Sequence, residues 1–342
     1  MRSYNVAVVG ATGAVGLEMV SLLERRNFPV NKLYLFASER SEGKIVKFKG
    51  EDCRVIKLAP QNIPDDLDIA LFSAGAAVSR EYAPLFVEKG IFVVDNSSAW
   101  RMEPEIPLVV PEVNAHVLSK DKKLISNPNC STIQMVVVLH PIDKYARITR
   151  VIVSTYQSVS GAGGRAIEEL LLESRKFLSG EEVPRVVTGG KFPYRIAFNL
   201  FPHIDVFLEN GYTKEEMKMV NETRKIMSRQ DLMISATCVR VPVVRAHSES
   251  VWIETERKVS PEEVRAILER APGVKVVDDV EGLMYPMPID AEYNEYTLVG
   301  RIREDISTER GVVLWIVSDN LWKGAALNAV QIAEVLVERN II

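Results

Sequence analysis

The feature that constrains the fold most is a glycine-rich stretch near the start of the chain. Residues 6–16 read VAVVGATGAVG, which places Gly10, Gly13 and Gly16 three residues apart. The valine-rich run before the glycines is typical of a buried strand, and LEMVSLLERR after them has the spacing of an amphipathic helix. Glycines let the backbone approach a pyrophosphate, and a helix N-terminus offers N–H donors and a positive dipole. The stretch predicts a dinucleotide-binding loop, with a plain tight turn as the alternative.

The rest of the first third repeats this alternation of strands and helices. Short apolar runs occur at 32–37, 68–74 and 91–95, and the stretch between the last two has a helical pattern that ends at a glycine. Strands alternating with helices indicate βαβ units and a mostly parallel sheet. We expect an α/β protein whose Rossmann-like, dinucleotide-binding domain spans residues 1–128. The amphipathic C-terminal helix, residues 323–342, is expected to pack back on this domain and complete it.

The middle of the chain has longer strands and fewer helices. Strand-like runs lie at 150–157, 234–243, 249–256, 295–303 and 311–319, and helical patterns lie between them. Long strands around few helices are typical of an antiparallel or mixed sheet. We therefore predict a second, α+β domain over residues 129–322.

Composition excludes several classes of protein. A chain of 342 residues is long for one hydrophobic core, and its net charge of −4 argues against a general nucleic-acid surface. It has no apolar run long enough to span a membrane and no signal-peptide layout at its start. Three scattered cysteines do not make a disulfide framework, and four histidines show no metal-ligand spacing. We expect a cytoplasmic protein with no metal, no membrane contact and no nucleic-acid partner.

The loop after the second strand bears on cofactor choice. In dinucleotide-binding folds an acidic residue at this point often holds the ribose 2′-OH of NAD. Here Arg40 can pair with a 2′-phosphate, and Ser38 and Ser41 can donate hydrogen bonds to it. Glu39 either points away or binds the ribose hydroxyls of NAD. A solvated polar turn is the alternative interpretation of the loop.

One cysteine and one histidine stand out chemically. NPNCST places Cys130 at the start of an apolar helix, whose N-terminus favours a thiolate and can hold an oxyanion. His247 lies in the polar loop VRAHSES just before a strand, where an imidazole can exchange protons near neutral pH. Cys53 and Cys238 lie inside strand-like runs and suit a hydrophobic core. Taken alone, Cys130 and His247 are also compatible with structural roles.

Several charged residues suit anion binding. Arg101 follows the fourth strand, at the carboxyl edge where α/β sheets bind ligands. Arg240 lies among strand residues, which is unusual unless it meets an anion. Glu215 and Lys218 are three residues apart on one helical face, a spacing that most often makes a solvated ion pair.

These motifs together resemble one enzyme family. GATGAVG, SAWRM, NPNCST, QSVSGAGG, EEMKM, TCVRVPVVRAHSES and DNLWKGAA occur in the order found in aspartate-semialdehyde dehydrogenases, from about residue 5 to residue 335. The resemblance implies NADP-dependent reductive dephosphorylation of L-4-aspartyl phosphate to L-aspartate 4-semialdehyde, through a cysteine thioester. This step belongs to lysine (diaminopimelate), threonine, methionine and isoleucine biosynthesis. The resemblance also implies a homodimer or a dimer of dimers.

The resemblance assigns roles within the catalytic set. Cys130 matches the family's nucleophile and His247 its general acid/base. Gln157 matches the residue that orients the substrate, and Asn129 beside the cysteine completes the set.

Substrate and phosphate contacts follow from the same matches. Arg240 matches the residue that binds the substrate α-carboxylate, and Glu215 matches the one near the amino group. Since Glu216 is adjacent, this assignment can be off by one residue. Arg101 and Lys218 match the pair that binds phosphate.

The cofactor contacts combine the glycine loop, the loop after the second strand and positions near the nicotinamide. The candidate residues are Gly10, Thr12, Gly13, Ala14, Val15, Ser38, Arg40, Ser41, Ser73, Ser160, Gly161 and Asn320.

Three rival interpretations remain at this point. N-acetyl-γ-glutamyl-phosphate reductase, another acyl-phosphate reductase, shares the glycine loop, cysteine and histidine. Glyceraldehyde-3-phosphate dehydrogenase is usually NAD-linked, which the serines and arginine after the second strand disfavour. A non-catalytic NADP-binding sensor would leave Cys130 as a core residue.

Overall fold

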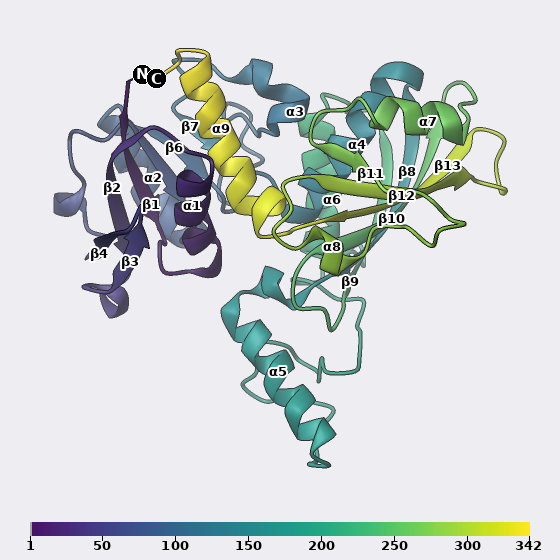
Figure 1. Ribbon diagram of the computed structural model, residues 1–342, viewed down its shortest axis with the longest axis horizontal. Helices are drawn as coiled ribbons and strands as arrows, with labels where there is room; N and C mark the ends of the chain where they lie inside the picture. The colour runs from purple at the N-terminus through teal and green to yellow at the C-terminus, as the bar shows by residue number, and fades with distance from the viewer. Residues whose placement is uncertain (1) are drawn as a thin grey trace. The chain divides into compact units, whose positions relative to one another are not determined.

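The computed structural model describes residues 2–342. They form two compact units (Figure 1). Unit 1 comprises residues 2–129 and 325–342, and unit 2 comprises residues 130–324. Within the described residues, no helix is long and apolar enough to cross a membrane.

Unit 1 is built on a seven-stranded sheet within residues 2–129, in the order β3-β4-β2-β1-β5-β6-β7. Every pairing in this sheet is parallel except that of β3 with β4. The Rossmann-like prediction is confirmed. The strands are β1 Tyr4–Val9, β2 Val30–Ala37, β3 Ile45–Phe48, β4 Glu51–Lys57, β5 Ile69–Phe72, β6 Phe92–Asp95 and β7 Leu124–Ser126, and the longer helices are α1 Ala14–Arg25, α2 Ala76–Glu88 and α9 Leu327–Glu338.

The C-terminal helix α9 belongs to unit 1, as predicted. It contacts α1, the short helix α3 Pro111–Asn114, and strands β5 and β6. Arg26 makes two hydrogen bonds to the Glu334 carboxylate, at 2.7 and 2.8 Å. Asn328 is buried and donates to the Val109 carbonyl at 2.9 Å, so polar contacts as well as apolar packing hold the helix in place.

Unit 2 is built on a six-stranded mixed sheet, in the order β11-β12-β13-β10-β8-β9. Strands β8 and β9 are parallel, and β10 runs antiparallel to both β8 and β13. Helices α4, α6 and α7 contact the sheet, and α4 contacts the other two helices. The elements are α4 Cys130–Ala146, β8 Ile148–Gln157, α5 Gly164–Leu178, α6 Lys214–Ile226, β9 Met233–Arg240, β10 His247–Thr255, α7 Pro261–Leu268, β11 Val274–Val276, α8 Pro288–Ala291, β12 Thr297–Glu304 and β13 Gly311–Ser318.

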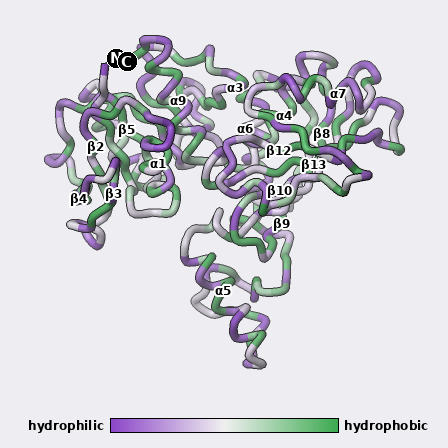
Figure 2. The backbone as a smooth tube through the Cα atoms, in the orientation of Figure 1, coloured by the Kyte–Doolittle hydropathy of each residue, from purple (hydrophilic) through white to green (hydrophobic). Residues whose placement is uncertain are grey.

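The strands of unit 2 alternate between a buried and a more exposed face. On β8, Val151, Val153 and Thr155 are buried, whereas Ile152 and Tyr156 are exposed. Successive side chains of a strand point to opposite faces, so the buried set lies on one face. Figure 2 shows hydrophobic residues along the central strands of this sheet. The buried face is apolar along most of β8 and becomes polar at its end.

Candidate active site

Three strand ends bring the candidate catalytic side chains of unit 2 together. In the sheet register Gln157, the last residue of β8, lies opposite both Arg240 and His247. Arg240 ends β9, which is parallel to β8, and His247 begins β10, which is antiparallel to it. All three side chains are at most 5% exposed, so their polar groups face one another in a site that excludes bulk water.

Cys130 begins helix α4 in the same unit. It is half-buried, and the helix dipole and the positive charge of Arg240, which interacts electrostatically with it, both favour a thiolate. A Cβ on Gly324 would lie 2.9 Å from the Cβ of Cys130, so a glycine is needed there. Cys238 is buried, and burial raises its thiol pKa far above the ordinary value. Cys53 is only half-buried, so the expectation of a core position holds for Cys238 alone.

Arg240 is buried with its charge intact. Its Nη1 donates to the Ser158 carbonyl at 2.5 Å, and its guanidinium lies 5.7 Å from the centre of the Phe192 ring. Burial lowers the pKa of Arg240, while Glu215 and Cys130 raise it in part. A buried, planar cation with remaining donors suits bidentate recognition of a carboxylate.

Glu215 and Glu216 have different surroundings. Glu215 accepts a hydrogen bond from Gln157 at 3.2 Å and pairs with Lys218 at 3.0 Å. Both Glu216 oxygens accept from backbone N–H groups, those of Thr213 and Cys238. Glu216 therefore holds the helix and strand together, and Glu215 is the glutamate that joins the cluster.

Lys218 lies between two carboxylates. Besides Glu215 it binds Asp205 at 2.8 Å, and only 19% of its side chain is exposed. Burial by itself would lower the pKa of Lys218, but Glu215 and Asp205 outweigh burial and raise it to about 12. The pair with Glu215 is therefore a mostly buried contact, which differs from the solvated pair typical of this spacing.

His247 is enclosed and neutral. It is fully buried, and burial together with the charge of Arg240 lowers its pKa to about 3. Its Nδ1 lies 3.0 Å from the backbone nitrogen of Ser158 and 3.1 Å from the Ser158 hydroxyl. The buried imidazole is therefore neutral at neutral pH, and its exchange of protons during the reaction stays a prediction.

The turn after β8 carries the predicted cofactor residues Ser160 and Gly161, and a third, Asn320, follows β13. Asn320 is buried, and its Oδ1 accepts from Ser160 at 3.1 Å and from the backbone of Ala246 at 2.9 Å. Gly161 is exposed and lies against the ring of His247. Asn320 thus ties this turn to the residue that precedes His247.

The glycine loop of unit 1 is tightly packed. A Cβ on Gly16 would lie 2.2 Å from the Gly10 carbonyl oxygen, and Gly10 has a φ of +87°. Gly13 caps helix α1 without a side-chain hydrogen bond, so the first turn is free to bind an anion. Thr12 donates to the Ser41 hydroxyl at 3.1 Å, which joins the glycine loop to the loop after β2.

Glu39 turns away from Arg40 in the loop after β2. Its carboxylate pairs at 3.1 Å with Lys57, the residue that lies beside Ala37 in the sheet. Ser38 and Arg40 are exposed, whereas Ser41 is buried. Glu39 thus makes an exposed ion pair with Lys57 on β4, and the two alternatives left by the sequence, pointing away or binding the ribose hydroxyls of NAD, stay predictions.

The remaining predicted residues of unit 1 lie at the ends of its strands. Arg101 is 8% exposed and donates to the Asn96 carbonyl at 2.9 Å. Lys218, the other residue predicted to bind phosphate, belongs to unit 2. Ser73 is half-buried directly after β5, and Asn129 is buried directly before Cys130.

Sequence reasoning missed Glu249, which lies two residues after His247 on the same face of β10. It is fully buried, opposite Thr155 of β8, and its environment includes Gln134 on α4. Burial raises the pKa of Glu249 well above its ordinary value, so the folded protein holds it protonated. Alternation along the strand could have predicted an inward carboxyl at this position.

Glu249→Gln is expected to change how stability depends on pH. The unfolded chain releases this proton above a pH of about 4.3, and the folded chain keeps it, so wild-type stability falls as pH rises from there, by up to about 1.4 kcal/mol per pH unit. Glutamine cannot ionise, so the melting temperature of the variant relative to wild type should rise between pH 5 and pH 8. Glu254→Gln, at the partly exposed end of β10, is the control. Equal pH profiles for both variants would contradict a buried neutral acid.

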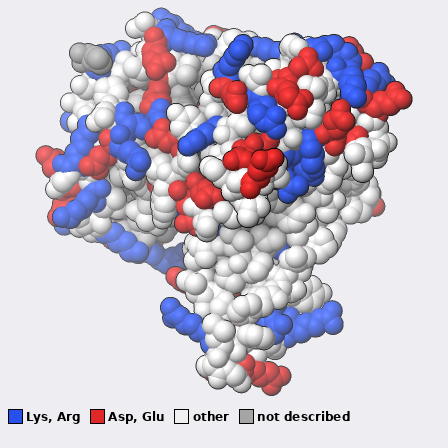
Figure 3. All heavy atoms as spheres, turned by 45° about the vertical axis from the view of Figure 1, so that its right-hand side comes forward, with Lys and Arg blue, Asp and Glu red and all other residues white. Residues whose placement is uncertain are grey.

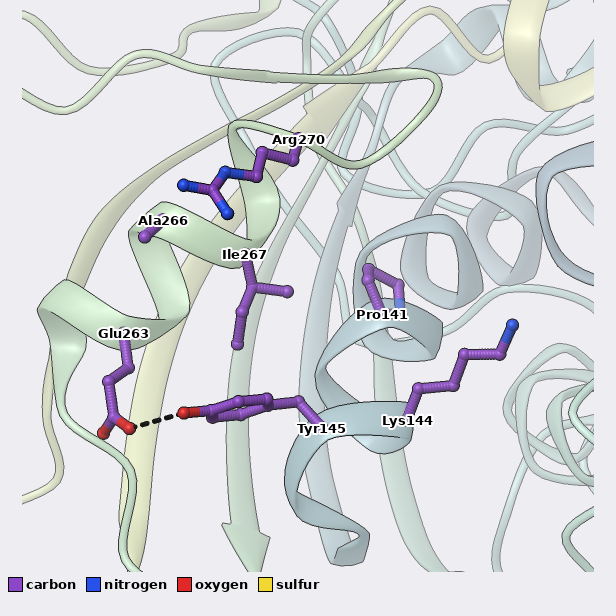
Figure 4. A pocket seen from close by; sticks show the side chains of 7 residues that line it. All are labelled: Pro141, Lys144, Tyr145, Glu263, Ala266, Ile267 and Arg270. Carbon is purple, nitrogen blue, oxygen red and sulfur yellow. Dashed lines mark hydrogen bonds between the residues drawn. The ribbon is translucent and has the colours of Figure 1, made fainter.

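A surface cavity of about 560 Å³ lies elsewhere in unit 2, between the C-terminal end of α4 and α7 (Figure 4). Its only carboxylate, Glu263, accepts a hydrogen bond from Tyr145 at 2.8 Å. Pro141 and Lys144 line it about 20 Å along the helix axis from Cys130. None of the candidate catalytic residues lines it, so it is no candidate for the chemistry.

Comparison with known proteins gives the family. Residues 5–121 match the NAD binding domain of semialdehyde dehydrogenases, and residues 139–323 match their dimerisation domain. A relative from Aquifex aeolicus (strain VF5), named aspartate-semialdehyde dehydrogenase, is 56% identical over 341 residues, which are 99% of this chain and 99% of the relative. The chain belongs to the aspartate-semialdehyde dehydrogenase family. The family prediction drawn from the motifs is confirmed.

Solved aspartate-semialdehyde dehydrogenases have the same fold. The crystal structure of aspartate semialdehyde dehydrogenase II complexed with ASA from Vibrio cholerae has a TM-score of 0.94 at 46% identity and covers 99% of each chain. The aspartate semialdehyde dehydrogenase with NADP from Candida albicans has a TM-score of 0.77 at 26% identity and covers 100% of each chain.

Proposed function

We propose that this protein is an NADP-dependent aspartate-semialdehyde dehydrogenase that reduces L-4-aspartyl phosphate to L-aspartate 4-semialdehyde. The main support for the proposal is that three neighbouring strand ends bring together Gln157, Arg240 and His247. They lie in the same unit as Cys130, which is its first residue. An acyl phosphate becomes an aldehyde when a nucleophile displaces phosphate and later leaves. A thiolate does both, through a thioester.

The buried charges suit an amino-acid head group. Arg240 offers donors to the α-carboxylate, and Glu215 offers an acceptor to the α-amino group. Gln157, which is hydrogen-bonded to Glu215, then orients the acyl group toward the sulfur of Cys130. Lys218 and Arg101 are the cations assigned to the phosphate. Phosphate that binds Lys218 replaces part of the contact between Lys218 and Asp205. Phosphate therefore competes with this internal ion pair.

We assign the dinucleotide to the glycine loop. A side chain at Gly10 or Gly16 would collide with the protein's own backbone, so these glycines permit the tight turn before the α1 N-terminus. The bound cofactor would supply the hydride that reduces the thioester. Gly13 leaves the α1 N-terminus to the pyrophosphate, with Thr12, Ala14 and Val15 beside it. Ser73, Ser160, Gly161 and Asn320 are the remaining proposed contacts, of which Ser160 and Asn320 act mainly by shaping the turn after β8.

We assign preference for NADP to Arg40, Ser38 and Ser41. Pairing with Lys57 removes Glu39 from the position where a carboxylate would repel a 2′-phosphate. The relative from Candida albicans was solved with NADP, which supports NADP as the proposed cofactor.

Arg40→Ala is expected to lower kcat/KM for NADP about 10- to 100-fold, because a hydrogen-bonded ion pair to the 2′-phosphate is lost. The value for NAD should change little. Arg54→Ala, an exposed arginine on β4, is the matched control. An equal loss of kcat/KM with NADP and NAD would show that Arg40 does not bind the 2′-phosphate.

Steady-state kinetics test the substrate assignment. The protein is expected to oxidise aspartate semialdehyde with phosphate and NADP, and to be far slower with N-acetylglutamate semialdehyde. An acetylated amine carries no positive charge, so the substrate would lose its proposed ion pair with Glu215. Higher kcat/KM with the acetylated substrate would favour the N-acetyl-γ-glutamyl-phosphate reductase alternative. No turnover with either would favour the non-catalytic sensor.

A homodimer formed through unit 2 accounts for its exposed apolar surface. In Figure 3 few charged side chains lie on the white surface that adjoins the α5 segment at the bottom of the view. Exposed apolar residues of α5, the 181–212 segment and β8 include Leu172, Leu178, Phe198, Phe207, Ile152 and Tyr156. Patches of this kind mark protein interfaces.

The two units are assigned different roles. We assign NADP binding to residues 1–128 with the C-terminal helix, and catalysis and dimerisation to residues 129–322. A cytoplasmic setting suits the three free cysteines, and the product would enter the synthesis of lysine, threonine, methionine and isoleucine.

A further inference from the structure

Asp319 is a fully buried carboxylate directly after β13. Its Oδ2 accepts hydrogen bonds from Nε of Arg245 and from the backbone N–H of Tyr293, both at 2.7 Å. Its Oδ1 accepts from the backbone N–H groups of Leu321 at 2.9 Å and of Trp322 at 3.1 Å. These donors fill the acceptor sites of the carboxylate, so the side chain is held in a single orientation.

The arginine that pairs with this carboxylate, Arg245, comes two residues before His247. Its guanidinium lies over the Tyr293 ring, 3.9 Å from the ring centre, and its side chain is 8% exposed. Ala246, between the arginine and the histidine, has a φ of +69°, a left-handed conformation that surrounding contacts must hold. One such contact is the hydrogen bond from the Ala246 N–H to Asn320 at 2.9 Å. The start of β10, and with it His247, is therefore held by the two residues that follow β13.

The backbone carbonyl of Asp319 faces the cysteine. It accepts a hydrogen bond from the backbone N–H of Gly324 at 3.0 Å. A Cβ on Gly324 would lie 2.9 Å from the Cβ of Cys130, so the Gly324 backbone lies directly against the residue that begins α4. Asp319 thus connects the backbone beside Cys130 to the arginine that precedes His247.

We propose that the buried ion pair of Asp319 with Arg245 sets the spacing of Cys130 and His247 that the thioester chemistry requires. The inference rests on the proposed function and on the family roles of these two residues, in which Cys130 attacks the acyl group and His247 transfers protons. Because the protein's own donors fill the acceptor sites of Asp319, it acts on the chemistry through its neighbours. Asp319 and Arg245 are therefore positioning residues.

The proposal separates the rate of the chemistry from binding of the substrate. The pair joins the start of β10 to the end of β13, whereas Arg240 ends β9 and Glu215 lies on α6. Loss of the pair should therefore misalign the reacting groups and leave the contacts to the amino-acid head group largely in place. A displacement of about 1 Å can cost on the order of 10²-fold in rate.

Arg245→Met tests this separation. It should lower kcat for aspartate semialdehyde about 10- to 100-fold and change KM by less than about threefold. Arg245→Lys keeps the charge but not the planar contact with the carboxylate and the ring, so it should fold more stably and lose several-fold in kcat. This variant carries the same test should Arg245→Met fail to fold. Asp319→Asn should lower kcat like Arg245→Met, and the double variant should lose no more than either single one.

Arg229→Met is the matched control for stability. Arg229 is also a buried arginine of unit 2, and its Nε pairs with Asp231 at 2.9 Å. It donates to the carbonyl of Ile148, which begins β8, whereas the site lies at the other end of that strand, at Gln157. Arg229→Met should lower the melting temperature about as much as Arg245→Met and leave kcat near the wild-type value.

Several results would overturn the inference. These are a wild-type kcat in Arg245→Met and Arg245→Lys, a loss confined to KM, or losses of kcat that add in the double variant. Equal losses of kcat in Arg245→Met and Arg229→Met would show that only stability is involved. All of them would leave the dehydrogenase assignment intact, whereas failure of the proposed function would appear as no turnover of aspartate semialdehyde by wild type.

Discussion

Cys130→Ala is expected to abolish aspartate semialdehyde oxidation, lowering kcat on the order of 10⁴-fold or more, as loss of a covalent nucleophile does in other enzymes. No thioester can form without the sulfur, and neither Cys53 nor the buried Cys238 can replace it. Steady-state NADPH production with phosphate and substrate in excess measures the loss.

Two controls accompany this variant. Cys53→Ala, in unit 1, should leave kcat near the wild-type value. An unchanged melting temperature for Cys130→Ala would exclude unfolding as the cause, since the side chain is only half-buried. Near-normal turnover by folded Cys130→Ala would contradict covalent catalysis.

Arg240→Leu is expected to raise KM for aspartate semialdehyde about 10²- to 10³-fold, because removing one partner of a buried charge pair leaves the substrate carboxylate uncompensated. The effect on kcat should be much smaller, since the carboxylate contact exists in both the ground state and the transition state. Initial rates over a wide range of substrate concentration separate the two constants.

Arg240→Lys is the conservative comparison. Lysine keeps the charge but not the planar fork, so it should recover only part of the lost affinity. Because Arg240 also holds the Ser158 carbonyl, thermal unfolding of both variants must be compared with wild type. A loss confined to kcat would place Arg240 at the reacting atoms and not at the carboxylate.

The fold could be predicted where local pattern determines it. The glycine spacing before a helix predicted the loop that Gly10 and Gly16 form, and alternation of apolar runs predicted a parallel sheet. Strand β3 was not predicted, and β4 was recognised only as a strand-like run around Cys53, because charged residues interrupt their apolar pattern. The partner of Glu39 could not be found without the pairing of β2 with β4, which brings Lys57 beside the loop after β2.

The site could be predicted in its residue types but not in its contacts. Motifs singled out Cys130 and, more than 100 residues further along the chain, Arg240 and His247. Their contacts depend on strand register, which places Gln157 between His247 and Arg240. The choice of Glu215 over Glu216 likewise needed the backbone donors that occupy Glu216.

Little in the sequence indicates that Ser158 and Glu249 belong to the site. Ser158 acts on His247 through its backbone N–H, which no residue pattern specifies. Glu249 follows His247 by two residues, and alternation indicates its face, but only the packing of α4 makes it fully buried.

The central claim is a thioester on Cys130, and trapping it is the most direct test. The enzyme is mixed with aspartate semialdehyde and NADP without phosphate, quenched in acid, digested and analysed by mass spectrometry. We predict about one NADPH per active site, an aspartyl group on the Cys130 peptide, and its loss when phosphate is added before the quench. Stoichiometric NADPH with an unmodified Cys130 peptide would contradict the account.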